Sequence, residues 1–211
     1  MNIRVKDLGL CNYTETYDLM REFNERRNSS TRDEIWLLEH SPVYTLGISG
    51  KEEHLLNTKD IPVIKTDRGG QVTYHGPGQL IAYLLIDLNR QPYKIKKLVS
   101  LIEQSIIDYL HDCGVKADRK EKAPGVYVNN KKIAALGVRV RKGSTYHGLA
   151  FNIDMDLAPF NGINPCGYAS MKCTQLSRFM NGVSILEVKK SFPGYLLKHL
   201  DQSSEKFSDV A

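Results

Sequence analysis

The stretch DRGGQVTYHGPGQLIAYLLIDL, residues 67–88, combines two glycine-containing turns with a short β-forming segment and a long apolar one. It predicts a strand at 71–75, a turn at 76–78, and a long, largely buried strand at 79–88. Because glycine carries no Cβ, the four glycines of this stretch would let another group approach the backbone closely. A phosphate, a metal ion and an acyl chain are the candidate groups.

The rest of the chain adds helices and strands in clusters rather than in strict alternation. Apolar residues at helical spacing predict helices at 14–27, 94–113, 184–192 and, after a break at Pro193, 194–200. Segments rich in β-forming residues predict strands at 34–40, 61–67, 125–130, 131–142 and 145–154, with a loop at 41–50. This order indicates an α+β fold, a mixed β-sheet flanked by helices, and not a doubly wound parallel fold.

Length and composition favour a single cytoplasmic domain. The chain has 211 residues, 41% hydrophobic and 25% charged, without a repeat or a linker, so one domain over residues 1–211 is expected, with a frayed tail from about 201 to 211. No apolar run approaches the roughly 18 residues of a membrane helix, and the first 19 residues lack a signal segment. Four cysteines without a CxxC pair favour free thiols in a reducing cytosol.

The glycine pattern fits neither a nucleotide site nor a metal site. The string GxxxxGK[ST] is absent, and the Gly-Pro-Gly turn opens a strand, with Ile81 where a dinucleotide fingerprint needs its third glycine. His75, His147, Cys166 and Cys173 lack the short spacing of zinc ligands, so no metal is expected. The net charge of +5 suits an acidic partner, although a solvated basic surface gives the same balance, and no nucleic-acid-binding module is recognisable.

A cysteine is the best candidate for a nucleophile, because the serine motif GxSxG is absent. Cys166 lies in INPCGYA between Pro165 and Gly167, where a loop would expose it, whereas a buried inert thiol is the alternative. Spacing alone favours a Cys–His pair with His75 or His147, both in the string TYHG, although either could be a core imidazole. The lysines of NNKKIAALG could instead supply a cationic neighbour.

Four motifs together closely resemble one known family. They are RGGQVTYHGPGQL (68–80), KIAALG (132–137), HGLAFNIDMDL (147–157) and INPCGYASM (163–171), in this order. The chain resembles the bacterial octanoyltransferases of protein lipoylation (lipoyl/octanoyl transferase B, the lipoate-protein ligase B family) over about two-thirds of its length. The resemblance implies the fold of biotin and lipoate ligases. It also implies transfer of an octanoyl group from octanoyl-acyl carrier protein to a lysine ε-amine of lipoyl domains, on 2-oxoacid dehydrogenases and the glycine cleavage H protein.

The resemblance also assigns roles to residues and makes a cofactor, ATP, nucleic acid or a membrane unnecessary. It makes Cys166 the acyl-accepting nucleophile and Lys132 the residue that lowers the pKa of the Cys166 thiol. This Cys–Lys pair replaces the Cys–His pair that spacing alone favours. The family's acyl pocket would be lined by Arg68, Gly69, Gly70, Gln71, Val72, Thr73, Tyr74, His75, Ala135, Leu136, Gly137, Gly148, Leu149 and Ala150. The glycines of the opening stretch would then admit an acyl chain and its carbonyl group.

Two alternatives and one departure from the family pattern stay open. An ATP-dependent lipoate or biotin ligase of the same fold would not need Cys166, and a non-catalytic acyl-carrier-binding protein would carry it as a structural residue. The family commonly has glycine and an apolar residue where Ser170 and Cys173 stand. Cys173 therefore raises the possibility of a disulfide with Cys166 under oxidation.

Overall fold

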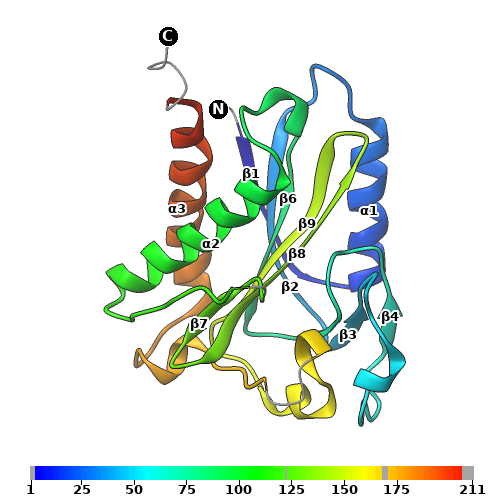
Figure 1. Ribbon diagram of the computed structural model, residues 1–211, viewed down its shortest axis with the longest axis vertical. Helices are drawn as coiled ribbons and strands as arrows, with labels where there is room; N and C mark the ends of the chain where they lie inside the picture. Colours follow the sequence, from blue (N-terminus) through cyan, green and yellow to red (C-terminus); the bar gives the residue numbers. More distant parts are fainter. Residues whose placement is uncertain (1–2, 122, 168–170, 206–211) are drawn as a thin grey trace.

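The computed structural model describes residues 3–121, 123–167 and 171–205, which form two β-sheets with helices on both faces of the larger one (Figure 1). The six strands of the large sheet run in the order β1 (Ile3–Cys11), β2 (Asp33–His40), β6 (Gln79–Leu85), β9 (Ser144–Asn152), β8 (Lys131–Arg141) and β7 (Val126–Val128). Only β1 and β2 pair in parallel within this sheet. The predicted α+β architecture, a mixed sheet flanked by helices, is confirmed.

A smaller sheet lies beside the large one and carries the first part of the glycine stretch. Its strands run in the order β4 (Val63–Lys65), β3 (Val43–Leu46) and β5 (Val72–His75). β3 pairs in parallel with β4 and antiparallel with β5. β5 and β6 are consecutive in sequence but belong to different sheets, so the turn at 76–78 connects the two sheets.

Helices cover both faces of the large sheet. α2 (Ile95–Asp112) and α3 (Ile185–Glu205) pack on one face, and α1 (Tyr13–Arg26) on the other (Figure 1). The alternation of side chains in β2 shows why: Ile35 and Leu37 join the core under α2 and α3, whereas Trp36 and Leu38 join the core under α1. Both faces of the central strands are therefore buried.

Three sequence-based predictions need correction. Residues 3–11 form the edge strand β1, which was not predicted, and the expected loop at 41–50 contains β3. Pro193 does not break the last helix, because α3 continues from Ile185 to Glu205 with Pro193 inside it. Proline costs about 3 kcal/mol within a helix. Four fully buried side chains at four-residue spacing, on both sides of the proline, offset that cost: Val188, Phe192, Leu196 and Leu200.

Short 3₁₀ helices occupy the connections. They are η1 (Glu52–His54), η2 (Leu88–Arg90), η3 (Ala158–Gly162), η4 (Pro165–Gly167) and η5 (Leu176–Arg178). The last three lie between β9 and α3, in the segment that holds the candidate nucleophile. Among the residues that the structure describes, none of the helices has the length and apolar character needed to cross a bilayer.

The turn at 76–78 is hydrogen-bonded to β2 and to the residues that follow β9. Its Gly78 N–H donates to Glu39 Oε2 at 2.8 Å, and its carbonyl accepts from the N–H groups of Ile153 and Asp154 at 3.2 and 3.0 Å. A Cβ on Gly78, whose φ is +82°, would overlap the Asp154 carbonyl oxygen, and one on Gly76 would overlap the Tyr74 hydroxyl. Protein atoms therefore fill the space beside these two glycines, and the expectation that they admit an acyl chain is wrong.

Candidate active site

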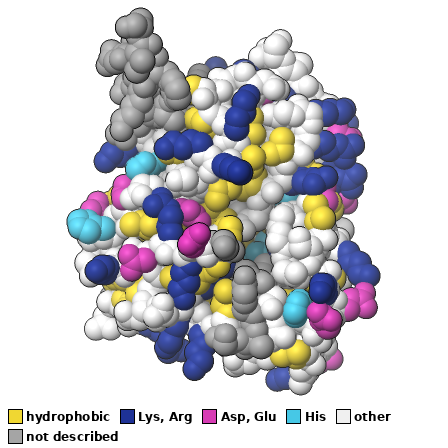
Figure 2. Space-filling view, in the orientation of Figure 1, with side chains coloured by type: hydrophobic (Ala, Val, Ile, Leu, Met, Phe, Trp, Pro, Cys, Tyr) yellow, Lys and Arg dark blue, Asp and Glu magenta, His cyan; other side chains and the backbone are white. Residues whose placement is uncertain are grey.

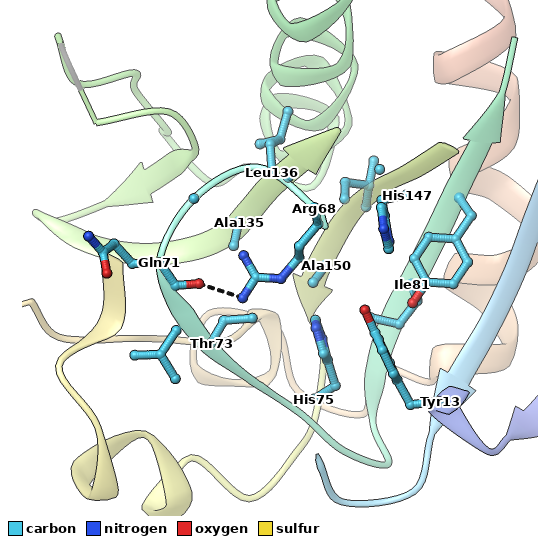
Figure 3. A pocket seen from close by; sticks show the side chains of 16 residues that line it. Tyr13, Arg68, Gln71, Thr73, His75, Ile81, Ala135, Leu136, His147 and Ala150 are labelled. Carbon is cyan, nitrogen blue, oxygen red and sulfur yellow. Dashed lines mark hydrogen bonds between the residues drawn. The ribbon is translucent and has the colours of Figure 1, made fainter. Parts of the chain in front are cut away.

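The loop between β4 and β5 is folded around the side chain of Arg68, which is 8% exposed. Its guanidinium donates through Nε to Thr45 Oγ1 at 2.9 Å and through Nη2 to the carbonyl oxygens of Thr45 and Gln71, both at 2.6 Å. Nη1 donates to the carbonyl of Gly69 at 2.9 Å. Figure 3 shows Arg68 at the centre of the cavity with its bond to Gln71. Arg68 thus holds the loop 68–71 in place as well as lining the cavity.

Glycines bring this loop and two strands into close contact. Gly137 on β8 pairs with Gly148 on β9, and a Cβ on Gly137 would lie 3.0 Å from the carbonyl oxygen of Gly69. A Cβ on Gly148 would overlap the carbonyl oxygen of Ala82 on β6. Gly70 has a φ of +89°, which a residue with a side chain rarely adopts. The backbone of the loop therefore passes directly over β8.

A cavity opens where the loop, β5, β6, β8 and β9 meet. The cavity volume is about 50 Å³, and the whole space between its walls, with the open solvent at its mouth, is about 520 Å³. It is lined by Tyr13, Arg68, Gly70, Gln71, Val72, Thr73, His75, Ile81, Tyr83, Ala135, Leu136, Gly137, His147, Gly148, Leu149 and Ala150. The structure thus brings together all predicted pocket residues except Gly69 and Tyr74. Gly69 lines an adjoining cleft, and Tyr74 is 3% exposed in the core beneath the small sheet.

Sequence reasoning did not place four of the residues that line this cavity. They are Tyr13, Ile81, Tyr83 and His147, which come from α1, β6 and β9. Tyr13 follows the helix cap Asn12, whose side chain accepts from the N–H groups of Thr14 and Glu15. Only the alternation of β6, which sends Ile81 and Tyr83 to the same face, is a signal in the sequence that could have found two of them.

Two buried imidazoles, His75 and His40, lie at or next to the wall of the cavity. His75 Nδ1 lies 2.7 Å from Gln79 Oε1, and His40 Nε2 lies 2.7 Å from the Tyr83 hydroxyl. Burial lowers the pKa of His40 to about 4 and holds that of His75 well below its usual range. Both imidazoles are therefore neutral near pH 7; His75 lines the cavity, and His40 is hydrogen-bonded to Tyr83, which lines it.

His147 is held from beneath by Asp67. Its Nε2 lies 3.2 Å from Asp67 Oδ1, and the hydroxyl of Tyr146 donates to Oδ2 of the same carboxylate. Burial lowers the pKa of His147, although Asp67 opposes the shift, and His147 Nδ1 is buried without a partner. The backbone of His147 has a φ of +59° within β9, an unfavourable conformation that the surrounding strands maintain.

Lys132 lies in the cleft next to this cavity. The cleft is lined by Gly69, Gly70, Gln71, Val99, Ala123, Pro124, Lys132, Leu136, Gly137 and Val138, and four of these residues also line the cavity. Lys132 is 3% exposed, and its Nζ donates to the Pro124 carbonyl at 3.0 Å and lies 5.3 Å from the ring centroid of Tyr127. The neighbouring Lys131 is exposed and lines a different cleft, so the two lysines point to opposite sides of β8.

The candidate nucleophile lies in η4, although the side chain of Cys166 is outside the described residues, as is Ser170. The next residue, Gly167, lies against the wall of the cavity, since a Cβ there would be 3.5 Å from the Gln71 side chain. Further along, the backbone of residues 172–174 runs beside Lys132: Lys132 N–H donates to the Lys172 carbonyl at 2.8 Å, and Thr174 N–H to the Lys132 carbonyl at 2.9 Å. One flank of the nucleophile segment thus lies against Gln71, which lines both the cavity and the Lys132 cleft, and the other flank pairs with the backbone of Lys132.

The side chains of Cys173, Cys11 and Cys113 are partly buried. Within the described part of the chain, no group of three or more His, Cys, Asp or Glu side chains is arranged to hold a metal ion.

The fold defines a class of protein. A crystal structure of lipoate-protein ligase A bound with ATP superposes with a TM-score of 0.77 over 97% of this chain and 86% of that one, at 15% identity. Biotin protein ligase from Aquifex aeolicus, in complex with biotin and ATP, gives a TM-score of 0.59 over 99% and 73% of the two chains, at 12% identity. The chain therefore has the biotin/lipoate ligase-like fold that its motifs predicted.

Sequence similarity defines the family. A family model of the lipoyl protein ligase A/B catalytic domain matches residues 12–196. An octanoyltransferase of Pseudomonas entomophila is 53% identical over 95% of this chain and 94% of its own length, and one of Vibrio cholerae is 52% identical over 98% and 95%. The chain belongs to the lipoyl protein ligase A/B family and, within it, to the octanoyltransferases, which are acyltransferases.

Proposed function

We propose that the protein moves an octanoyl group from octanoyl-acyl carrier protein to the ε-amine of a specific lysine on lipoyl domains, through a thioester on Cys166. The acceptors would be the lipoyl domains of 2-oxoacid dehydrogenases and the glycine cleavage H protein. The observation that carries the proposal is the position of Lys132, a buried lysine whose cleft adjoins the glycine-walled cavity and whose backbone pairs with the segment after Cys166.

The first step loads the protein. The Lys132 ammonium stabilises the Cys166 thiolate, which attacks the thioester carbonyl of the carrier. The bond between the carbonyl carbon and the carrier sulfur breaks, a new thioester forms on Cys166, and the departing thiolate takes the proton of Lys132. One thioester replaces another, so this exchange is close to balanced in free energy and needs no ATP.

The second step unloads it. The lysine amine of the acceptor attacks the Cys166 thioester, Lys132, now neutral, accepts a proton from the amine, and the thiolate leaves. An amide replaces a thioester, which drives the reaction forward. The acyl chain itself would lie in the cavity, against the small and apolar side chains of Ala135, Leu149 and Ala150.

The surface charge supports an encounter with acidic partners. The net charge is +5, and Figure 2 shows lysine and arginine side chains distributed around apolar ones on one face of the molecule. Electrostatic attraction of this kind raises the association rate and weakens as salt is added.

An intact mass measurement tests the proposal. The purified protein is mixed briefly with octanoyl-acyl carrier protein, beside Cys166→Ser and the control Cys113→Ser. We expect a mass gain of one octanoyl group that hydroxylamine removes, present in the control and missing in Cys166→Ser. Amide product without any adduct would contradict the covalent route and indicate direct transfer. Product that forms only from free acid and ATP would indicate a ligase.

A further inference from the structure

The segment 123–127 covers the side chain of Lys132. Pro124 supplies the carbonyl that accepts from Nζ, and Tyr127 places its ring face 5.3 Å from the same atom. Between them, Gly125 has a φ of +138°, and a Cβ on it would lie 2.7 Å from the Ala134 carbonyl oxygen and 3.0 Å from Lys132 Cε. The backbone at Gly125 therefore packs directly on the lysine and leaves room only for glycine.

A carboxylate on α2 anchors this segment. Glu103 is 7% exposed; its Oε1 accepts from the Gly125 N–H at 2.9 Å, and its Oε2 accepts from Arg119 Nε at 3.0 Å. A carboxylate is costly to bury unless it is paired and hydrogen-bonded, so this arrangement stabilises one position of the segment. Arg119 is itself fixed to α2, since its Nη2 donates to the Ser100 carbonyl and to Gln104 Oε1.

The helix that carries Glu103 is a rigid support. Three of its side chains, Leu98, Ile102 and Ile106, are fully buried in the core between α2, α3 and the large sheet. A continuous set of contacts therefore runs from the core through Glu103 to the Gly125 N–H, and through the Pro124 carbonyl to Lys132 Nζ.

We propose that Glu103 is a positioning residue for acyl transfer, which holds the Pro124 carbonyl, and through it the Lys132 ammonium, at a fixed distance from the reacting thioester. This inference rests on the role proposed above for Lys132. A displacement of about 1 Å at a reacting group can lower a rate by roughly 100-fold, so a contact outside the cavity can control catalysis.

Four variants test it by their kinetic constants for octanoyl transfer. Glu103→Met removes the acceptor of the Gly125 N–H. Glu103→Gln keeps an acceptor oxygen and loses the charge. Arg119→Met removes the ion pair and keeps the Gly125 bond. The exposed Glu121, in the same connection, supplies the control Glu121→Met.

We expect Glu103→Met to lower kcat by roughly 10- to 100-fold while KM for octanoyl-acyl carrier protein stays within about twofold. Glu103→Gln should recover most of that loss, and Arg119→Met should lose less than Glu103→Met. An equal loss in Glu103→Gln and Glu103→Met, or a loss confined to KM, would overturn the proposal.

A purely structural role gives a different result. Leu110→Ala creates a cavity about two turns further along the same helix from Glu103 and lowers the melting temperature. At a temperature where all variants are folded, Leu110→Ala should keep kcat near that of the parent protein, and an equal loss there would overturn the proposal. Lys132→Met is measured beside them: full activity in Lys132→Met contradicts the proposed function, whereas an inactive Lys132→Met with an active Glu103→Met contradicts only this inference.

Discussion

His147 and Asp67 form a hydrogen-bonded pair beneath the cavity, with His147 Nε2 3.2 Å from Asp67 Oδ1. Partial burial alone would raise the pKa of Asp67, but hydrogen bonds from His147, Tyr146 and Tyr17 outweigh it and hold that pKa well below its usual range. The carboxylate therefore accepts, and His147 carries its proton on Nε2. The other ring nitrogen of His147, Nδ1, carries no proton and is buried in the wall of the cavity.

Asp67→Asn tests the strength of this pair. We expect it to lower the free energy of unfolding by about 1–2 kcal/mol at neutral pH. Because the folded-state pKa of Asp67 is depressed, its contribution is complete above the unfolded value of about 4 and is lost as the pH falls below it. Urea unfolding of both proteins at several pH values should show a constant difference above about pH 5 that narrows below pH 4. The exposed Asp60→Asn is the control; a difference that widens on acidification would contradict the assignment.

Arg68→Lys tests whether the hydrogen bonds of the Arg68 guanidinium hold the loop 68–71 in place. A lysine cannot reproduce the planar fork that reaches the Thr45, Gly69 and Gln71 carbonyls together, so we expect a loss of roughly 3 kcal/mol in unfolding free energy. Octanoyl transfer should fall as the loop loses its position. Urea unfolding and a transfer assay measure the two effects, with the exposed Lys65→Arg as the neutral control. A variant as stable as the parent protein would show that the bonds contribute little.

Gly148→Ala and Gly194→Ala should change stability in opposite directions. A methyl group at 148 would overlap the Ala82 carbonyl oxygen and lie 2.7 Å from Leu84 Cδ1, so β6 and β9 must separate, at a cost of about 3 kcal/mol. Gly194 lies exposed on α3 with no atom within 4 Å of an added Cβ, and alanine there should add about 0.5–1 kcal/mol. Thermal melts of both variants decide this; equal melting temperatures would refute the packing argument.

Cys173→Ala tests the oxidation of the site. With mild oxidant, we expect the parent protein to lose transfer activity and regain it on reduction, because a disulfide between Cys166 and Cys173 protects the nucleophile from irreversible oxidation. In Cys173→Ala the loss should be irreversible, while Cys113→Ala should behave like the parent protein. Activity after dithiothreitol treatment measures the difference, and an equally reversible loss in Cys173→Ala would contradict the disulfide.

Strong local patterns were enough to predict most of the fold. The helix expected at 94–113 is α2, Ile95–Asp112, and the strand expected at 131–142 is β8, Lys131–Arg141. β1 was missed because it is a half-exposed edge strand whose register shifts between Asp7 and Leu10, so its apolar residues do not alternate cleanly. Pro193 was misjudged because a proline signal is local, whereas the burial that keeps α3 continuous is tertiary.

The cavity was predicted only in part, for a similar reason. Motifs of adjacent residues located its loop and the walls on β8 and β9. Tyr13 comes from the start of α1 and Tyr83 from the middle of a buried strand, where an aromatic residue is equally typical of a core. The packing of α1 on the sheet shows that these rings face a cavity.

The bonds of the turn at 76–78 have a consequence for substrate binding. Gly78 is tied to Glu39 on β2 and to residues 153–154 after β9, and Gln79 Nε2 at the start of β6 donates to the Tyr74 carbonyl on β5, so hydrogen bonds join the two sheets at this turn. In the proposed function, an acyl chain would enter between walls that these bonds already join, so less conformational entropy would be lost on binding than between unconnected walls. Selection among acyl chains would then depend on the shape of this cavity and on its fit to each chain.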